Sequence, residues 1–443
     1  MILLLLALGT GWSQNNDTPS PADADVRDSA NQTEAGLDSE PSSNGVDLLS
    51  DRTSALPLSY MQSDLQASIG AENNPALVSG NASQISAVTE VTGRFTLLKS
   101  RRRSQTSITY RGGDTLYSSY GGSGLYSLQS QRPTAAESIR WRRGQISFED
   151  SFSYTSNRGF GSPGGLSVPK VLAGFDSSGA IEYGPAFINN VSGATVTEEL
   201  TRRSSAQFSG AYSITDYVNN NENLFNSRQV STQAQYGYQI SRSNNIGLSY
   251  GYQDIQFVPA IETLVANSAQ FIFQHTVSAR MELVLGAGPE KIVNSGISLK
   301  TQLTPTVQAS FNYRGKRSDL SLSYNRVVTS GSGYYAGGIQ DGAGASANWK
   351  LSRLWEVTTH GGYFRVNVVG LSATGTEIPR FEYWSADAQV RRHLGRSLSA
   401  IASYRFNSYS SGACGLAQSC GPAAHLNTVL LGLDWSVRPV RLE

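Results

Sequence analysis

Apolar and polar residues alternate strictly along many short stretches of the chain, and this period of two constrains the fold more than any other feature. The clearest stretch is Gln229 to Ile240, in which Val, Thr, Ala, Tyr, Tyr and Ile share one face and Gln, Ser and Gly share the other. Residues 206–214, 307–313 and 398–407 repeat the pattern. Because successive side chains of a β-strand point to opposite faces, the pattern predicts strands with one apolar and one polar face.

Short turns rich in Arg and Lys divide these predicted strands into pairs and hold 17 of the 33 basic residues that follow residue 57. The turns are 99–104, 142–144, 202–204, 241–243, 278–280, 314–317, 351–353 and 391–396. Longer segments rich in Gly, Ser and Asn lie between them, at 112–134, 157–193, 217–227, 330–340 and 410–424. The turns recur roughly every 40 residues, and such a period indicates a repeat architecture.

Two closed all-β architectures fit this period, a propeller with four strands per blade and a barrel with one hairpin per repeat. Each repeat has room for two strands of about 10 residues, which cross a bilayer when tilted, whereas a blade needs four shorter strands. Short turns that alternate with long loops are typical of bacterial outer-membrane barrels. The fold predicted is therefore all-β, a transmembrane antiparallel up-and-down β-barrel.

The turns also predict the number of strands. Eight turns join sixteen strands, and residues 63–72 and 425–437 add one at each end, which makes about 18, an even number as in bacterial single-chain barrels. Sixteen or twenty strands remain alternatives, if 60–72 is not a strand or if 157–193 contains a further hairpin.

The N-terminal region divides into two further segments. Residues 1–13 combine an aliphatic run with Gly11-Trp12-Ser13, which predicts a secretory signal peptide whose basic n-region is truncated, and the alternative is a short buried segment. Residues 14–57 contain nine acidic and two basic residues, a net charge of −7, with no aromatic residue. This composition predicts a disordered acidic periplasmic linker. The predicted barrel, 58–443, then carries 33 basic and 25 acidic residues, a net charge of +8.

The region 60–443 resembles the bacterial outer-membrane β-barrel superfamily, of porin size. Gly432, followed at +3 and +5 by Trp435 and Val437, is similar to the C-terminal insertion signal of that family, although a tail, Arg438 to Glu443, follows instead of a terminal Phe. The resemblance implies a location in the cell outer membrane, contact with its lipid, and insertion by the barrel-assembly machinery.

Since the apolar face of such a barrel meets lipid, its polar face lines the lumen. Strand parity predicts lumen-facing charges, candidates for selectivity, at Arg94, Glu149, Arg314, Lys350, Glu356, Glu382, Asp387, Arg405 and Asp434. These charges either bias a water-filled channel or pair across the lumen and fill it. The adjacent acids Glu149 and Asp150 break the parity, which predicts a bulge or a protonated Asp150, and a second bulge is predicted between Tyr363 and Phe364.

Few residues point to chemistry beyond a channel. Cys414 and Cys420, in an exported chain, predict a disulfide in the last long loop. The four histidines fall in different repeats, and no catalytic triad, metal motif or phosphate loop is visible, so we expect no enzyme, metal or cofactor. Basic residues gather in turns without interleaved aromatics, so we expect no nucleic-acid partner.

Three functions remain: porin-like passage of small hydrophilic solutes, export of a secreted polysaccharide or other polymer with periplasmic partners, and a structural or adhesive surface barrel without an open pore. The long loop 157–193 either narrows the channel or stays at the surface. The basic turns either are simply solvated or bind an anionic periplasmic partner, including the acidic linker of this chain. The oligomeric state is left open.

Overall fold

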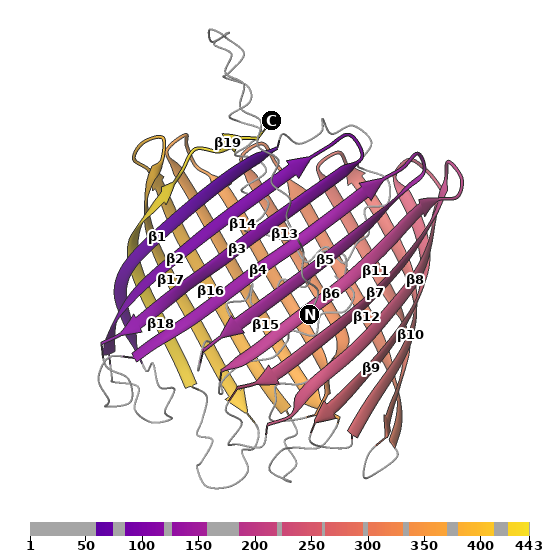
Figure 1. The fold of residues 1–443 in the computed structure, drawn as a ribbon. Helices are drawn as coiled ribbons and strands as arrows, with labels where there is room; N and C mark the ends of the chain where they lie inside the picture. The colour runs from indigo at the N-terminus through magenta and orange to yellow at the C-terminus, as the bar shows by residue number, and fades with distance from the viewer. Residues whose placement is uncertain are drawn as a thin grey trace, which may run out of the picture. The chain divides into compact units, whose positions relative to one another are not determined.

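The chain folds into a closed barrel of β-strands (Figure 1). The computed structural model describes residues 59–73, 85–118, 126–156, 186–218, 224–258, 262–295, 300–330, 336–369, 380–411 and 424–442. Within these residues no helix is long and apolar enough to cross a membrane. The strands of the barrel are β1 (Tyr60–Asn73), β2 (Ile85–Ser100), β3 (Ser104–Tyr117), β4 (Tyr126–Arg140), β5 (Gly144–Thr155), β6 (Phe187–Glu199), β7 (Ser204–Tyr217), β8 (Asn226–Gln239), β9 (Asn244–Val258), β10 (Glu262–Ser278), β11 (Met281–Ser295), β12 (Lys300–Arg314), β13 (Ser318–Thr329), β14 (Gly338–Lys350), β15 (Trp355–Val368), β16 (Arg380–His393), β17 (Leu398–Ser411) and β18 (Ala424–Ser436).

The topology is up-and-down, as the sequence predicts. Each strand pairs antiparallel with the next, and β18 pairs with β1 to close the ring. All eight predicted basic turns are short connections at one end, the upper rim in Figure 1, and the longer connections lie at the other end. The predicted fold class and strand number are confirmed. By the rule for such barrels the short-turn end is periplasmic and the other end extracellular.

The outer wall is apolar and the inner wall polar, the reverse of a soluble β-protein. On β18, for example, Leu431 and Leu433 point outward and are 61% and 51% exposed, whereas Thr428 points inward and is buried. The same alternation runs around the ring because each register keeps inward residues opposite inward residues. This is the architecture of a bacterial outer-membrane β-barrel, with its apolar band in lipid.

Some strands extend into segments that the sequence analysis assigned to loops. β3 runs to Tyr117 and β4 starts at Tyr126, inside the predicted loop 112–134, and β6 starts inside the predicted loop 157–193. Glycine explains the first error. A Cβ on Gly113 would lie 2.6 Å from the carbonyl oxygen of Val91 on β2, so glycine is needed there for close approach of two strands and not for a turn.

Neither predicted bulge is present. The β5–β6 register is unbroken from Gly144 to Thr155, which places Asp150 on the outer wall. The β15–β16 register is also unbroken, and Phe364 points inward, where its ring stacks on that of Tyr383 with centroids 6.3 Å apart. The described register shift lies instead between Thr276 and Ser278, near the periplasmic end of β10.

The closing seam between β18 and β1 has a tight contact at Gly432, the glycine of the predicted insertion signal. A Cβ on Gly432 would lie 2.5 Å from the carbonyl oxygen of Ala67 and 2.6 Å from the Cβ of Ser68. Beyond β18, the two-residue strand β19 (Val440–Arg441) continues the pairing with the start of β1. Val440 and Arg441, which follow the predicted signal, therefore extend the seam.

We expect the substitution Gly432→Ala to weaken this seam. The added methyl group must displace the backbone of β1, and overpacking of this kind costs about 1–3 kcal/mol. In a urea titration of the refolded protein, monitored by heat-modifiable gel migration, the variant should unfold at a lower urea concentration than the parent protein. Gly395→Ala is the matched control, because no atom lies within 4 Å of a Cβ there. Equal midpoints for the two variants would show that the contact does not matter.

Candidate functional site in the barrel lumen

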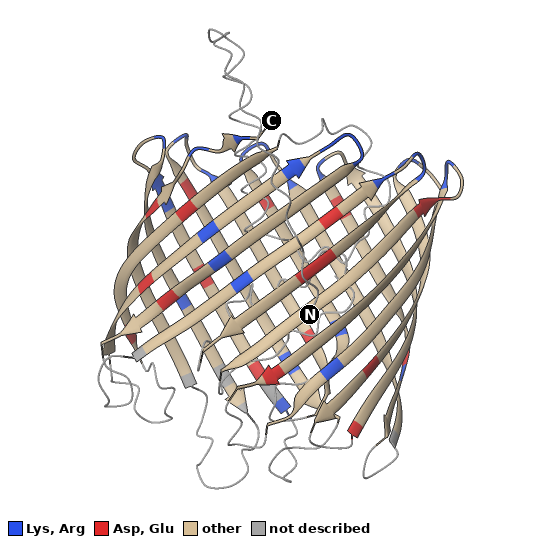
Figure 2. Ribbon diagram, in the orientation of Figure 1, with Lys and Arg blue, Asp and Glu red and all other residues tan. Residues whose placement is uncertain are grey.

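A row of arginines crosses one wall of the lumen. Arg94 on β2 pairs directly with Arg111 on β3, and Arg111 pairs with Arg132 on β4. All three lie near the middle of their strands and on the inner face, since outward neighbours such as Tyr110 are exposed to lipid. Figure 2 shows the row as slanting blue bands, and Asp64 of β1 lies directly opposite Arg94 at its end.

Direct opposition of like charges destabilises a β-sheet. The row of Arg94, Arg111 and Arg132 therefore lowers the stability of the fold. It also concentrates positive electrostatic potential on this wall. In a water-filled lumen such a potential attracts anions and repels cations. Strand parity predicts Arg94 but not the other two. Arg132 lies within the segment 112–134 and Arg111 directly before it, and the glycines of that segment resemble those of a loop.

Charges on the inner face of β12 to β18 alternate in sign, whereas β10 and β11 carry the acidic side chains Glu262, Glu282 and Glu290 on their inner faces. Near the periplasmic rim, the directly opposite pairs are Arg314 with Asp319, Lys350 with Glu356, and Glu356 with Arg391. Arg391 also forms a salt bridge with Asp434, with the nitrogen and oxygen 3.5 Å apart. Opposite charges placed this close cancel each other at a distance, so the inner face of β12 to β18 contributes little net potential.

A second row of mixed sign lies toward the extracellular half of the lumen. It runs from His360 through Asp387, Arg405 and Thr428 to Glu72, each directly opposite the next. The hydroxyl of Thr428 donates to Oε2 of Glu72 over 2.8 Å. This row has a single arginine with a carboxylate directly beside it, whereas the row on β2 to β4 places three arginines next to one another.

The nine predicted lumen charges can now be located. Eight lie on the inner face: Arg94, Glu149, Arg314, Lys350, Glu356, Asp387, Arg405 and Asp434. Glu382 does not. It lies on the outer face of β16, where the hydroxyl of Tyr363 donates to its carboxylate over 3.3 Å. Glu382 and Asp387 are an odd number of positions apart, so one regular strand cannot present both to the lumen.

Several other predicted features lie outside the described residues. They are Cys414 and Cys420, the signal and linker segments of residues 1–57, and most of the long loop 157–193. Of the insertion signal, Trp435 points outward from β18 and is 51% exposed, and Val437 follows the end of that strand.

The extracellular part of the β13–β14 hairpin leaves the barrel wall. Pairing between β12 and β13 stops at Val307 and Arg326, although β12 begins at Lys300 and β13 runs on to Thr329. β13 and β14 stay paired with each other as far as Thr329 and Gly338. The wall is therefore open between β12 and β13 toward the extracellular end.

An apolar cluster holds this part of the hairpin against the inside of the barrel. Val328 and Ile339 of the hairpin pack with Phe257 of β9, Leu264 of β10 and Ile292 of β11. Each of these five side chains is at most 3% exposed. Since the three partners belong to the inner faces of their strands, the hairpin crosses the lumen side of the wall and narrows the lumen there.

Polar contacts anchor the root of the hairpin, and a glycine shapes its tip. The guanidinium of Arg326 binds Asp341 over 2.9 Å and reaches Thr304 on the inner face of β12 over 3.5 Å. Gly337 has a φ of 77°, and a Cβ there would lie 2.8 Å from Cδ1 of Leu264. A backbone with positive φ and no side chain is what this close approach to the wall requires.

Val328→Asp should release the hairpin, because a carboxylate is unfavourable inside an apolar cluster. We expect a larger single-channel conductance in planar bilayers, since the lumen loses its constriction. Val327→Asp is the matched control, because the neighbouring side chain points to the opposite face of β13 and is not part of the cluster. A similar conductance change in both variants would argue against the constriction.

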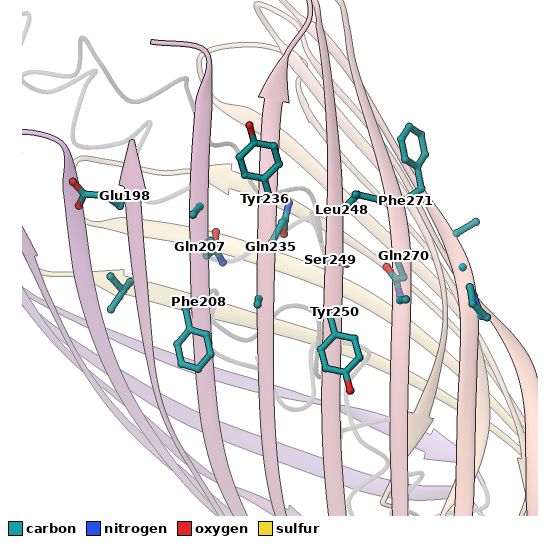
Figure 3. A pocket seen from close by; sticks show the side chains of 17 residues that line it. Glu198, Gln207, Phe208, Gln235, Tyr236, Leu248, Ser249, Tyr250, Gln270 and Phe271 are labelled. Atoms are coloured by element: carbon teal, nitrogen blue, oxygen red, sulfur yellow. The ribbon is translucent and has the colours of Figure 1, made fainter. Parts of the chain in front are cut away.

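The outer wall of β6 to β11 has a shallow apolar groove, shown in Figure 3. Phe208 and Tyr250 bound one side, Tyr236, Leu248 and Phe271 bound the other, and alanines of β7, β8, β10 and β11 form its floor. These bounding side chains are 45–62% exposed on the lipid face, with Tyr236 the least and Leu248 the most. The groove therefore belongs to the membrane surface and not to a path for solutes.

No protein-family model matches the chain, and no curated protein matches it. Among solved structures, the ferric-catecholate import receptor Fiu of E. coli K12 gives a TM-score of 0.42 at 10% identity, covering 87% of this chain and 82% of that one. OccK2 (OpdF) of Pseudomonas aeruginosa gives 0.41 at 11%, covering 85% and 98%. The outer membrane protein OpdK of the same organism gives 0.40 at 10%, covering 85% and 98%. Likenesses of this size carry no argument about function, and the assignment below depends on the geometry of the barrel itself.

Proposed function

We propose that this protein is an outer-membrane channel for small hydrophilic solutes and that it prefers anions. The observation that carries the proposal is the row of Arg94, Arg111 and Arg132, three arginines that lie directly opposite one another on one wall. Charged rings and rows that line a pore bias its selectivity, and an arginine-rich lining favours anions.

The character of the inner wall supports a path that contains water. Gln, Ser, Thr and Asn dominate the inward positions, as on β8, where Gln229, Ser231 and Gln235 are inward and buried against their neighbours. A barrel with this many strands is wide enough for side chains to leave an aqueous space. The proposal includes no catalytic step, no metal and no cofactor, in keeping with the expectation from the sequence.

Neutralising the arginine row should reduce the anion preference. We expect the triple variant Arg94→Gln, Arg111→Gln and Arg132→Gln to shift the reversal potential of a planar bilayer under a KCl gradient toward the cation value. Each single variant should give a smaller shift in the same direction. Because the screening length falls from about 10 Å at 0.1 M salt to about 3 Å at 1 M, the difference from the parent protein should shrink at high salt.

Arg314→Gln provides the matched control for this experiment. It removes the same charge from the inner face of the barrel, but at a position on β12 whose directly opposite residue on β13 is Asp319 and not another arginine. If the control shifts the reversal potential as much as a single substitution in the row, the row has no special role. An unchanged reversal potential in the triple variant would contradict the proposed anion preference.

The basic turns at the periplasmic rim form the second charged feature, visible as the blue upper rim in Figure 2. We propose that this rim binds an anionic periplasmic segment, with the acidic residues 14–57 of the same chain as the first candidate, because opposite charges at short range attract. Deletion of residues 15–55 should then change the single-channel conductance or the ion selectivity at low salt. If both stay unchanged, the rim is only solvated.

A further inference from the structure

The apolar groove on the outer face of β6 to β11, called here the β6–β11 groove, runs across the strands and not along them (Figure 3). Part of its lining is a line of directly opposite residues on β6 to β10: Val196, Phe208, Ala234, Tyr250 and Ala269. Val196 is three residues from the periplasmic end of β6, whereas Ala269 is nine residues from the periplasmic end of β10. The groove therefore begins near the periplasmic rim at β6 and slants toward the middle of the membrane.

The dimensions of the groove match one leaflet of the membrane. Its volume of about 770 Å³ is in the range of sites that hold small molecules. Neighbouring strands are about 4.8 Å apart, so a groove across six strands is about 24 Å long. Because the strands tilt by about 35–45°, the groove descends by about 14–17 Å, which is close to half of the roughly 30 Å hydrocarbon core. A single extended acyl chain spans the same depth, since two leaflets make up the core.

The shallow end of the groove is charged. Glu198, one residue from the periplasmic end of β6, lines this end, and the indole N–H of Trp141 donates to its Oε2 over 2.7 Å. The carboxylate packs over Gly144, where a Cβ would collide with it. Arg202 and Arg203 follow in the β6–β7 turn and are exposed. Since tryptophan side chains gather at membrane–water interfaces, one carboxylate and two guanidinium groups lie at the depth of the lipid head groups.

We propose that the β6–β11 groove binds one phospholipid of the periplasmic leaflet, with an acyl chain in the groove and a phosphoethanolamine head group at the β6 end. The apolar walls of the groove contact the chain on both sides, which a flat barrel wall does not provide. At the head group, Arg202 and Arg203 bind the phosphate, and the carboxylate of Glu198 pairs with the primary ammonium. A head group without an ammonium would leave Glu198 beside negative charge alone, so the site prefers the zwitterionic lipid to an anionic one.

Native mass spectrometry of the refolded full chain in detergent tests the head group. Phosphatidylethanolamine and phosphatidylglycerol with identical acyl chains are added in separate titrations. We expect one phosphatidylethanolamine per barrel, at concentrations at which phosphatidylglycerol binds several-fold less. Glu198→Gln keeps an acceptor for the indole of Trp141 but removes the negative charge, so it should abolish this preference. A preference that is absent in the parent protein, or that survives in Glu198→Gln, overturns the proposed head group.

A second variant tests the acyl-chain site. Ala234 lies directly between Phe208 and Tyr250, so Ala234→Leu should fill the groove and lower the bound lipid several-fold. Ala402→Leu is the matched control, because Ala402 is an exposed alanine on the outer face of β17, at a similar distance from the periplasmic end of its strand and outside the groove.

Heat-modifiable migration of every variant checks that the barrel has folded. A folded parent protein that retains no lipid overturns the proposal, and so does an equal loss of lipid in Ala234→Leu and Ala402→Leu. A barrel dimer that Ala234→Leu disrupts would also overturn it, because a second copy would then occupy the groove. These outcomes are independent of the proposed anion preference, which bilayer recording tests separately.

Discussion

The structure depends on one requirement, that every backbone N–H and C=O inside a bilayer finds its partner within the protein. The pairing of β18 with β1 meets this requirement by removing both edges of the sheet. Closure also couples the faces of all strands. A shift of one residue in any register would turn that strand's polar side chains to the lipid and its apolar ones to the lumen. The arginine row on β2 to β4 therefore faces water because the whole ring is in register.

The same requirement explains where the ladder is allowed to open. β12 and β13 separate beyond Val307, toward the extracellular end, and a tilted strand needs only about 10 of its residues to cross the hydrocarbon layer. β12 has 15 residues and pairs with β13 over eight of them, Val307–Arg314, so the open part is the extracellular end of the strand, where water outside the membrane and in the lumen can bond the backbone. The apolar cluster around Leu264 then compensates for the lost ladder by burying Val328 and Ile339 against the inner wall.

The sequence predicted the features that depend on alternation within one strand. It did not predict the features that depend on contacts between strands far apart in the chain. The strand around Gln229 to Ile240, the eight basic turns and the ring of 18 strands follow from period and spacing. Arg111 and Arg132 were missed because Gly112 and Gly113 resemble a turn, whereas Gly113 permits close contact with β2 and Gly112 makes room for the ring of Tyr110. The inward hairpin had no local signal, since it depends on contacts between β13–β14 and three strands earlier in the chain. Asp150 was noticed from parity, which predicted a bulge or a protonated Asp150. The register is unbroken, and Ser192 and Asn190 donate hydrogen bonds to the carboxylate.

The arginine row and the inward β13–β14 hairpin lie on opposite sides of the ring. β3 and β12 lie half a barrel apart, so the hairpin that covers the inner side of β9 to β12 faces the wall that carries Arg94, Arg111 and Arg132. Charges in a water-filled lumen act over about 8 Å at physiological ionic strength, so a solute in the centre of a wide barrel would pass a single wall almost unaffected. A constriction built from the opposite wall narrows the aqueous space from that side and directs solutes toward the arginines. In the channel that we propose, the hairpin therefore brings solutes closer to the row of charges on the opposite wall.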